Sequence, residues 1–141
     1  MHEKYKYEKR SYYPHMMPAD VAIWERFIDK FPDMYDEVSY DIKVGNAPQF
    51  ATVVNEESGG DALDLYKLKI DVIGYKDNQI DIIEIGPRAG ANKVGQVKRY
   101  RYFYVKEFVP SVTPKAIVLT DIVDENTIEF AVSEGVFIAV A

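Results

Sequence analysis

The chain has 141 residues, of which 48% are hydrophobic and 28% charged, so its composition is that of one globular domain and excludes an intrinsically disordered protein. It contains no cysteine and two histidines, which excludes disulfide scaffolds, cysteine-based zinc sites and thiol nucleophiles. The formal net charge of −6 argues at first sight against nucleic acid, because phosphate binding requires a positive surface.

The chain begins with a predicted arm and a predicted helix. Residues 1–16 mix charged side chains with tyrosines and show no period, so we expect an extended arm before a single domain over 17–141. Pro18 suits the first turn of a helix, because the missing N–H has no partner there in any case. The spacing predicts an amphipathic helix over 18–31, whose apolar face is formed by Val21, Trp24, Ile28 and Phe31.

Beyond this helix the pattern predicts mainly strands. Polar and apolar residues alternate over 38–44, which is typical of a half-buried strand. Residues 45–62 are rich in loop-forming residues and are predicted as a loop, apart from a short strand at 50–54. The remaining predicted elements are, in chain order, two hairpin strands at 65–75 and 80–85, a helix at 91–107, a buried strand at 116–122 and two short strands at 127–132 and 135–140.

This order of elements predicts an α/β domain with a mixed β-sheet flanked by helices. The helix at 91–107 would join the strands at 80–85 and 116–122 by a right-handed crossover. No apolar run approaches the roughly 18 residues that span a bilayer, and the N-terminus lacks the apolar core of a signal peptide. We therefore expect no membrane partner and a cytoplasmic location, which for a viral protein is the infected host cell.

Two carboxylates lie inside predicted strands. Asp71 interrupts the apolar run of the first hairpin strand, and Glu84 interrupts that of the second. A carboxylate in such a strand is costly unless it is paired or binds a cation. If the two face one another, their oxygens suit Mg²⁺ or Mn²⁺, which can activate water against a phosphodiester. The alternative is that each is an ordinary charge on the solvent side of its strand.

Basic residues are concentrated in one stretch. Residues 88–106 contain six basic and no acidic side chains, so this stretch carries +6 and the rest of the chain −12. Phosphate contacts and stacking on aromatic rings would suit DNA. The alternative is a helix whose aromatic residues lie in the core and whose basic face is solvated. The candidate DNA-binding residues are Arg88, Lys93, Lys98, Arg99, Tyr100 and Arg101.

The helix at 91–107 adds a further motif. Gln96 and Tyr100 are four residues apart and therefore share a helix face, and Lys93 lies three residues before Gln96 on the same face. Together with the order helix, strand, strand with Asp71, strand with Glu84, basic helix and strand, this arrangement resembles the PD-(D/E)XK nuclease superfamily, and its Gln-x-x-x-Tyr element is similar to that of the RecB-like branch. The resemblance covers roughly residues 18–122.

The resemblance implies a restriction-endonuclease-like core in the order αβββαβ and a metal-dependent deoxyribonuclease. It implies that Asp71 and Glu84 hold Mg²⁺ or Mn²⁺, and that Glu25 in the first helix is a further metal ligand. It also implies that Gln96 and Tyr100 support the site and contact DNA. From the residues alone, Glu25 can equally be a solvated helix charge.

One position departs from the family pattern in a way that bears on activity. The pattern Glu-x-Lys would place a lysine at position 86, where this sequence has Gly86; the residue before Asp71 is Ile70 instead of proline, a minor change. Position 86 lies on the same strand face as Glu84, so that lysine would point into the site. We expect Lys93 to supply the cation instead, with Arg88 and then Lys69 as the next candidates.

Three hypotheses follow. The first is a metal-dependent DNA nuclease, with Asp71, Glu84, Lys93 and Gln96 as its catalytic residues, of a kind found in phages or mobile elements. The second is a catalytically inactive protein of the same fold that binds DNA or serves in a homo-oligomer or larger assembly. The third is an unrelated small α/β domain in which the matches are accidental.

Overall fold

The computed structural model describes residues 2–45 and 68–141. Their strands form one six-stranded sheet in which strand order follows chain order, from β1 to β6. The elements are β1 (Tyr5–Lys6), α1 (Pro18–Lys30), β2 (Glu37–Val44), β3 (Leu68–Lys76), β4 (Gln79–Arg88), α4 (Ala91–Phe108), β5 (Lys115–Ile122), α5 (Glu125–Ser133) and β6 (Val136–Val140).

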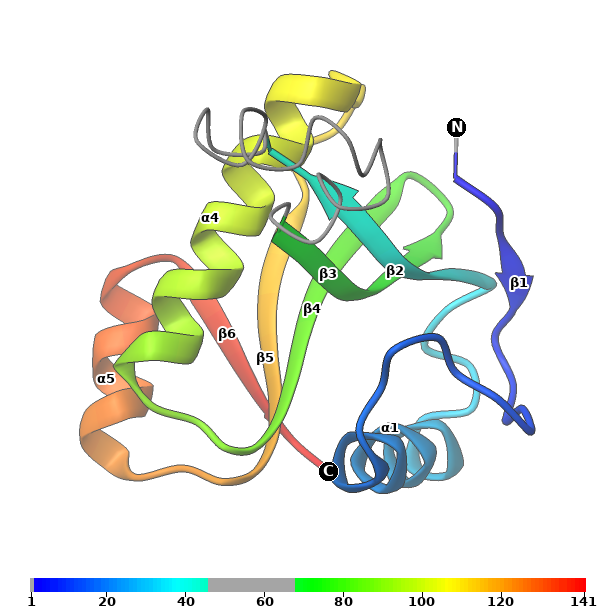
Figure 1. Ribbon diagram of the computed structural model, residues 1–141. Helices are drawn as coiled ribbons and strands as arrows, with labels where there is room; N and C mark the ends of the chain where they lie inside the picture. Colours follow the sequence, from blue (N-terminus) through cyan, green and yellow to red (C-terminus); the bar gives the residue numbers. More distant parts are fainter. Residues whose placement is uncertain (1, 46–67) are drawn as a thin grey trace, which may run out of the picture.

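The sheet is mixed, as predicted. Strands β1 to β4 pair antiparallel, whereas β4 with β5 and β5 with β6 pair parallel. Each parallel pair is connected by a helix, α4 for the first and α5 for the second. Figure 1 shows α4 and α5 on one face of the sheet and α1 on the other. The prediction of an α/β domain with helices on both faces of a mixed sheet is therefore confirmed.

One predicted strand is wrong. Residues 127–132 lie in helix α5, although Ile128 and Val132 are β-branched residues that favour strands. The N-cap of this helix is Asp124, whose carboxylate accepts a hydrogen bond from the N–H of Thr127 at 2.7 Å. The hydrogen bond of this N-cap stabilises the helix by more than the strand propensity of the β-branched residues disfavours it. The strand predicted at 135–140 is present as β6, and the one predicted at 50–54 lies outside the described residues.

The sheet separates two apolar clusters. On the α4 face, side chains of β2 to β6 pack against Val94, Val97 and Tyr104 of α4. On the α1 face, the cluster is rich in aromatic rings, with Trp24 fully buried and its indole N–H donating to the hydroxyl of Tyr40 at 3.0 Å. Strands β3 and β4 contribute residues to both clusters and are therefore covered on both faces, which explains their long apolar runs.

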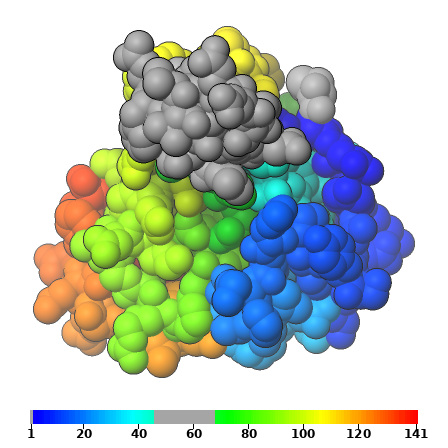
Figure 2. All heavy atoms as spheres, in the orientation of Figure 1, coloured from blue at the N-terminus to red at the C-terminus, as the bar shows by residue number. Residues whose placement is uncertain are grey.

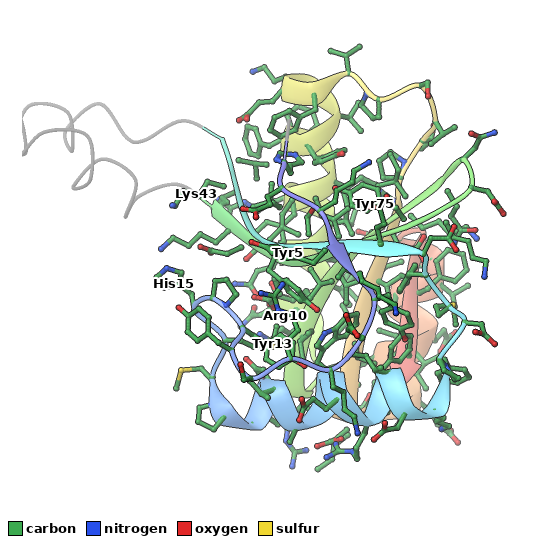
Figure 3. All side chains as sticks on the ribbon, turned by 90° about the vertical axis from the view of Figure 1, so that its right-hand side faces the viewer. Tyr5, Arg10, Tyr13, His15, Lys43 and Tyr75 are labelled. Atoms are coloured by element: carbon green, nitrogen blue, oxygen red, sulfur yellow. The ribbon has the colours of Figure 1, made fainter. Side chains whose placement is uncertain are left out.

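The N-terminal arm belongs to the second cluster. Tyr7 and Tyr13 are each 6% exposed and pack with the aromatic residues of α1 and β2. Figure 3 shows the arm crossing β2 toward α1, with Tyr5, Arg10 and Tyr13 along it. The guanidinium of Arg10 lies 4.0 Å from the centre of the Tyr5 ring. Tyr7 and Tyr13 thus anchor the arm in the aromatic cluster on the α1 face.

Helix α4 has 18 residues, and Val109, which caps its C-terminus, adopts the left-handed conformation with φ of 42°. A β-branched residue is strained there, and glycine is the usual residue at this position of a helix end. Val109 is 77% exposed, so its side chain contributes little packing. None of the described helices, α4 included, is both long and apolar enough to cross a membrane.

We expect Val109→Gly to raise the free energy of unfolding by about 1 kcal/mol, because it removes the strain without removing a buried contact. Urea denaturation of the two proteins measures the difference. Val105→Gly, at an exposed position inside the same helix, is the control and should destabilise by about 1 kcal/mol. Equal destabilisation by both substitutions would contradict the assignment of strain to Val109.

Candidate active site

The site lies where β3 and β4 separate. Their pairing runs from Lys76 opposite Gln79 to Val72 opposite Ile83, although both strands continue beyond it. Past this point the N–H of Ile85 donates to the Oδ2 of Asp71 at 2.8 Å. A side-chain carboxylate thus takes the hydrogen bond that a main-chain carbonyl would accept in a continuous ladder. The cost of leaving the N–H of Ile85 unpaired is avoided, and the strands can diverge around Asp71.

The separation of β3 and β4 leaves the carboxylates of Asp71 and Glu84 close together. The pKa of Asp71 is raised, first by burial and then by the neighbouring carboxylate of Glu84; the N–H of Ile85 and the ammonium of Lys93 act in the opposite direction. Glu84 is 5% exposed, and its Oε2 is buried with no hydrogen-bond partner among the described residues. The pair therefore combines two acidic groups with a buried acceptor atom that no described residue satisfies, an arrangement that a bound cation would stabilise.

Lys93 reaches this pair from the first turn of α4. Its Nζ lies 3.5 Å from the Oε1 of Glu84, and the side chains of Lys93 and Glu84 are 30% and 6% exposed. A Cβ placed on Gly86 would lie 2.7 Å from the Cε of Lys93 and 3.1 Å from its Nζ. The side chain of Lys93 therefore occupies the space into which a side chain at position 86 would extend. The space above Gly86 is filled by a lysine that belongs to the next element of the chain.

Tyr100 faces the same two acids from α4. It is 7% exposed, and its pKa is raised by burial first and then by the charges of Glu84 and Asp71. Gln96, one turn earlier, is half-buried, and no hydrogen bond joins it to either carboxylate within residues 2–45 and 68–141. Tyr100 thus lies against the acids, whereas Gln96, at the more exposed side of the same helix face, lines a hollow with Arg99 and Tyr102.

The first helix contributes a different acid from the expected one. Glu25 accepts a hydrogen bond from the hydroxyl of Tyr13 at 2.9 Å and so lies against the arm. The carboxylate of α1 that lies near the site is Asp20, whose pKa is raised by burial and then by Asp71 and lowered by Lys93. Glu25 is thus engaged with the arm, and its role as a metal ligand stays a prediction. The sequence does not single out Asp20 as a site residue, because an acid in the first turn of a helix is also favoured by the helix dipole alone.

The other two candidate cations lie elsewhere. Arg88 is exposed at the end of β4, and its charge lowers the pKa of Asp124, after the larger effect of the N–H of Thr127. Lys69 is half-buried on β3, where it pairs in register with Lys43 of β2. Neither forms an ion pair with Asp71 or Glu84 in the part of the chain that is described. Lys93 is thus the cation that the fold brings to the acids.

The remaining basic residues of α4 divide into two groups. Lys98 donates to Glu134 at 3.1 Å and Arg101 donates to the carbonyl of Gly135 at 3.4 Å, so both tie α4 to the end of α5. Arg99 is exposed and, with Gln96 and Tyr102, lines a shallow hollow on the outer side of the helix. Figure 2 shows that α4, in yellow-green, and the arm with α1, in blue, adjoin on one face of the molecule.

The donor atoms of Asp71 and Glu84 suit a hard metal ion. Two carboxylates in contact, one of them with an unpartnered buried oxygen, are hard oxygen ligands of the type that Mg²⁺ and Mn²⁺ prefer. Among residues 2–45 and 68–141 no group of three or more acidic or histidine side chains is close enough to hold a metal ion. The protein part of the site therefore fits a cation held by one or two carboxylates, the number typical of Mg²⁺ sites.

Comparisons with known proteins give the fold. No family model and no curated protein matches the sequence. Two solved structures match over 94% of this chain with a TM-score of 0.51: a repair endonuclease from Pyrococcus abyssi at 18% identity, and EndoMS in complex with double-stranded DNA at 14% identity. This chain spans 49% and 48% of those chains. The fold is thus shared with these two structures, as expected for a restriction-endonuclease-like core.

Proposed function

We propose that the protein is a metal-dependent deoxyribonuclease of the PD-(D/E)XK type, which hydrolyses phosphodiester bonds with Mg²⁺ or Mn²⁺. The observation that carries this proposal is the position of Lys93, whose side chain fills the space above Gly86 and places an ammonium 3.5 Å from Glu84. In a protein that had lost its catalytic lysine and kept only the fold, nothing would favour a second lysine at the same place. The inactive alternative is therefore not favoured.

Each residue of the site has a role in this proposal. Asp71 and Glu84 hold the metal ion, which when bound neutralises phosphate charge and lowers the pKa of a water molecule. The ammonium of Lys93 orients the attacking water by hydrogen bonding and stabilises negative charge that develops on the phosphoryl oxygens. Tyr100 packs against Glu84 and limits its rotamers. Arg99 and Gln96 lie on the exposed side of the same helix, where they contact the DNA backbone.

DNA as the substrate is supported by two observations. The stretch 88–106 carries six basic and no acidic side chains on an otherwise acidic chain, and of these Lys93 lies at the acids. The two structures that share the fold are named as a repair endonuclease and as a complex with double-stranded DNA. Since this chain spans about half of those proteins, the type of DNA is left to the experiment, which uses single-stranded, double-stranded and branched substrates.

The test measures cleavage of these three labelled substrates with Mg²⁺, with Mn²⁺ and with EDTA. We expect cleavage that requires the metal and falls by about 10³-fold in Lys93→Ala, since stabilisation of the developing charge is lost. Lys30→Ala, which removes an exposed lysine at the end of α1, is the matched control and should cleave as the wild type does. No cleavage of any substrate with either metal would overturn the proposal.

Metal binding is measured separately by titration calorimetry with Mn²⁺. We expect the heat of binding to disappear in Glu84→Gln and to persist in Glu25→Gln, because Glu25 is engaged with Tyr13 away from the acids. A protein that binds Mn²⁺ through Glu84 but cleaves nothing would support the inactive alternative. Loss of binding in Glu25→Gln alone would contradict the site described above.

A further inference from the structure

The last strand leaves one edge of the sheet unprotected. Within the described residues β6 pairs with β5 alone, and its five residues, Val136–Val140, include no charge and no proline. Proteins normally protect exposed edges with lysine, proline, bulges or very short strands. The opposite edge has this protection, since β1 consists of two residues and carries Lys6. The edge of β6 is therefore open to pairing with a further strand.

Apolar side chains surround this edge on both faces of the sheet. Phe137 and Val140 of β6 are 56% and 46% exposed, and Ile128 and Val132 of α5 are 40% and 70% exposed. Side chains of α5 and β6 line a hollow of about 390 Å³ along the edge, and none of the lining residues is charged. A contiguous apolar surface of this kind marks an interaction site.

We propose that this edge is an interface with a second copy of the same chain, in which two β6 strands pair antiparallel about a two-fold axis. Such an axis places the same residues of each copy against one another, so a charged edge would repel itself. Each copy carries a net charge of −6, whereas the residues that line the hollow between α5 and β6 are uncharged. A positive charge lies beside β6 at Lys115, whose Nζ is 5.7 Å from the centre of the Phe137 ring, and it is opposite in sign to the net charge of the second copy. The hollow can therefore meet its own copy without repulsion between like charges of its lining residues.

Helix α5 is needed for this interface to be stable. Standard interfaces bury about 1,200–2,000 Å² in total, more than a pair of five-residue strands provides. In the antiparallel arrangement Ile128 and Val132 of α5 cover the added strand on one face, and Phe137 covers it on the other. The exposed side chains of α5, which the domain itself leaves uncovered, are thereby explained. This inference is independent of the proposed nuclease activity.

The hydrogen bonds of β6 allow a precise test of strand pairing. The N–H of Ala141 donates to the carbonyl of Thr120 on β5 at 3.0 Å. Because successive N–H groups of a strand point to opposite sides, the N–H of Val140 points to the open edge. Val140→Pro therefore removes a donor that a second copy would use and leaves the hydrogen bonds to β5 in place.

The experiment is sedimentation velocity of the full chain over about 1 to 200 µM, a range suited to a micromolar dissociation constant. We expect the wild type to shift from the 16.2 kDa monomer toward twice that mass. Val140→Pro and Phe137→Lys should each raise the dissociation constant at least about tenfold while circular dichroism shows an unchanged fold. Tyr12→Lys, at a 65% exposed aromatic residue on the arm, should dimerise as the wild type does.

Two results would overturn the proposal. One is a wild-type protein that stays monomeric at every concentration. The other is a dimer that Val140→Pro leaves as tight as before, since strand pairing would then not form the interface.

Discussion

Moving the lysine from position 93 to position 86 restores part of the cleavage that Lys93→Ala abolishes, if Lys93 acts in the proposed way. In the double variant Gly86→Lys with Lys93→Ala, the new side chain extends into the space that Lys93 has left. Its ammonium then lies on the same strand face as Glu84. We expect cleavage at least about tenfold faster than in Lys93→Ala alone, since a single positioned cation contributes about 10²–10³-fold.

The single variant Gly86→Ala tests whether displacing the ammonium of Lys93 slows cleavage. Its Cβ would meet the Cε of Lys93 at 2.7 Å, so the flexible end of the lysine must move away from Glu84. We expect a loss of about 10- to 100-fold in cleavage with little change in stability. Gly95→Ala is the matched control, because an added Cβ meets nothing within 4 Å at that position. Equal rates in the two alanine variants would show that the position of Lys93 does not matter.

The second large effect concerns stability. Asp71→Asn should abolish Mn²⁺ binding and cleavage, yet raise the free energy of unfolding of the metal-free protein by about 1–2 kcal/mol at pH 8. The pKa of Asp71 is raised in the folded state by burial and by Glu84, so its ionisation disfavours folding. Its removal leaves Glu84 paired with Lys93 and relieves the repulsion between the two acids.

The sign of the pH dependence follows from the raised pKa. An unfolded Asp titrates near pH 4, and the folded group titrates at higher pH, so the wild type loses stability as the pH rises through this window. The Asp71→Asn variant should lack this loss of stability. The free energies of unfolding of the wild type and the variant, plotted against pH, should therefore converge near pH 4. Urea denaturation in EDTA from pH 4 to 9 measures the difference. A wild type whose stability relative to the variant increases with pH would contradict the pKa shift.

The elements of the sheet could be predicted because each has a local pattern. Asp71 and Glu84 stand out in apolar strands, and a hairpin connects those strands through the turn at 76–79. Lys93 could be ranked first because it shares a helix face with Gln96. What could not be predicted depends on how the layers pack: the separation of β3 and β4 requires the hydrogen bond from Ile85 to Asp71, which no sequence pattern encodes.

Two differences between the prediction and the structure have the same cause. The sequence predicts a strand over 127–132, whereas the cap at Asp124 favours the helix that is present there. The resemblance implies Glu25 as a metal ligand, whereas in the structure Glu25 accepts a hydrogen bond from Tyr13, and Asp20 is the acid of α1 whose pKa is raised by Asp71 after the larger effect of burial. In both cases an interaction of one specific side chain outweighs the average preference of its neighbours.

The acids and the ammonium of the site come from different layers of the molecule. Asp71 and Glu84 belong to the sheet, whereas Lys93 is carried by α4, which Lys98 and Arg101 tie to the end of α5. A chain in which the sheet has formed but α4 has not docked holds two like charges and no counter-charge. The two acids and the ammonium are therefore brought together only when α4 is packed against the sheet.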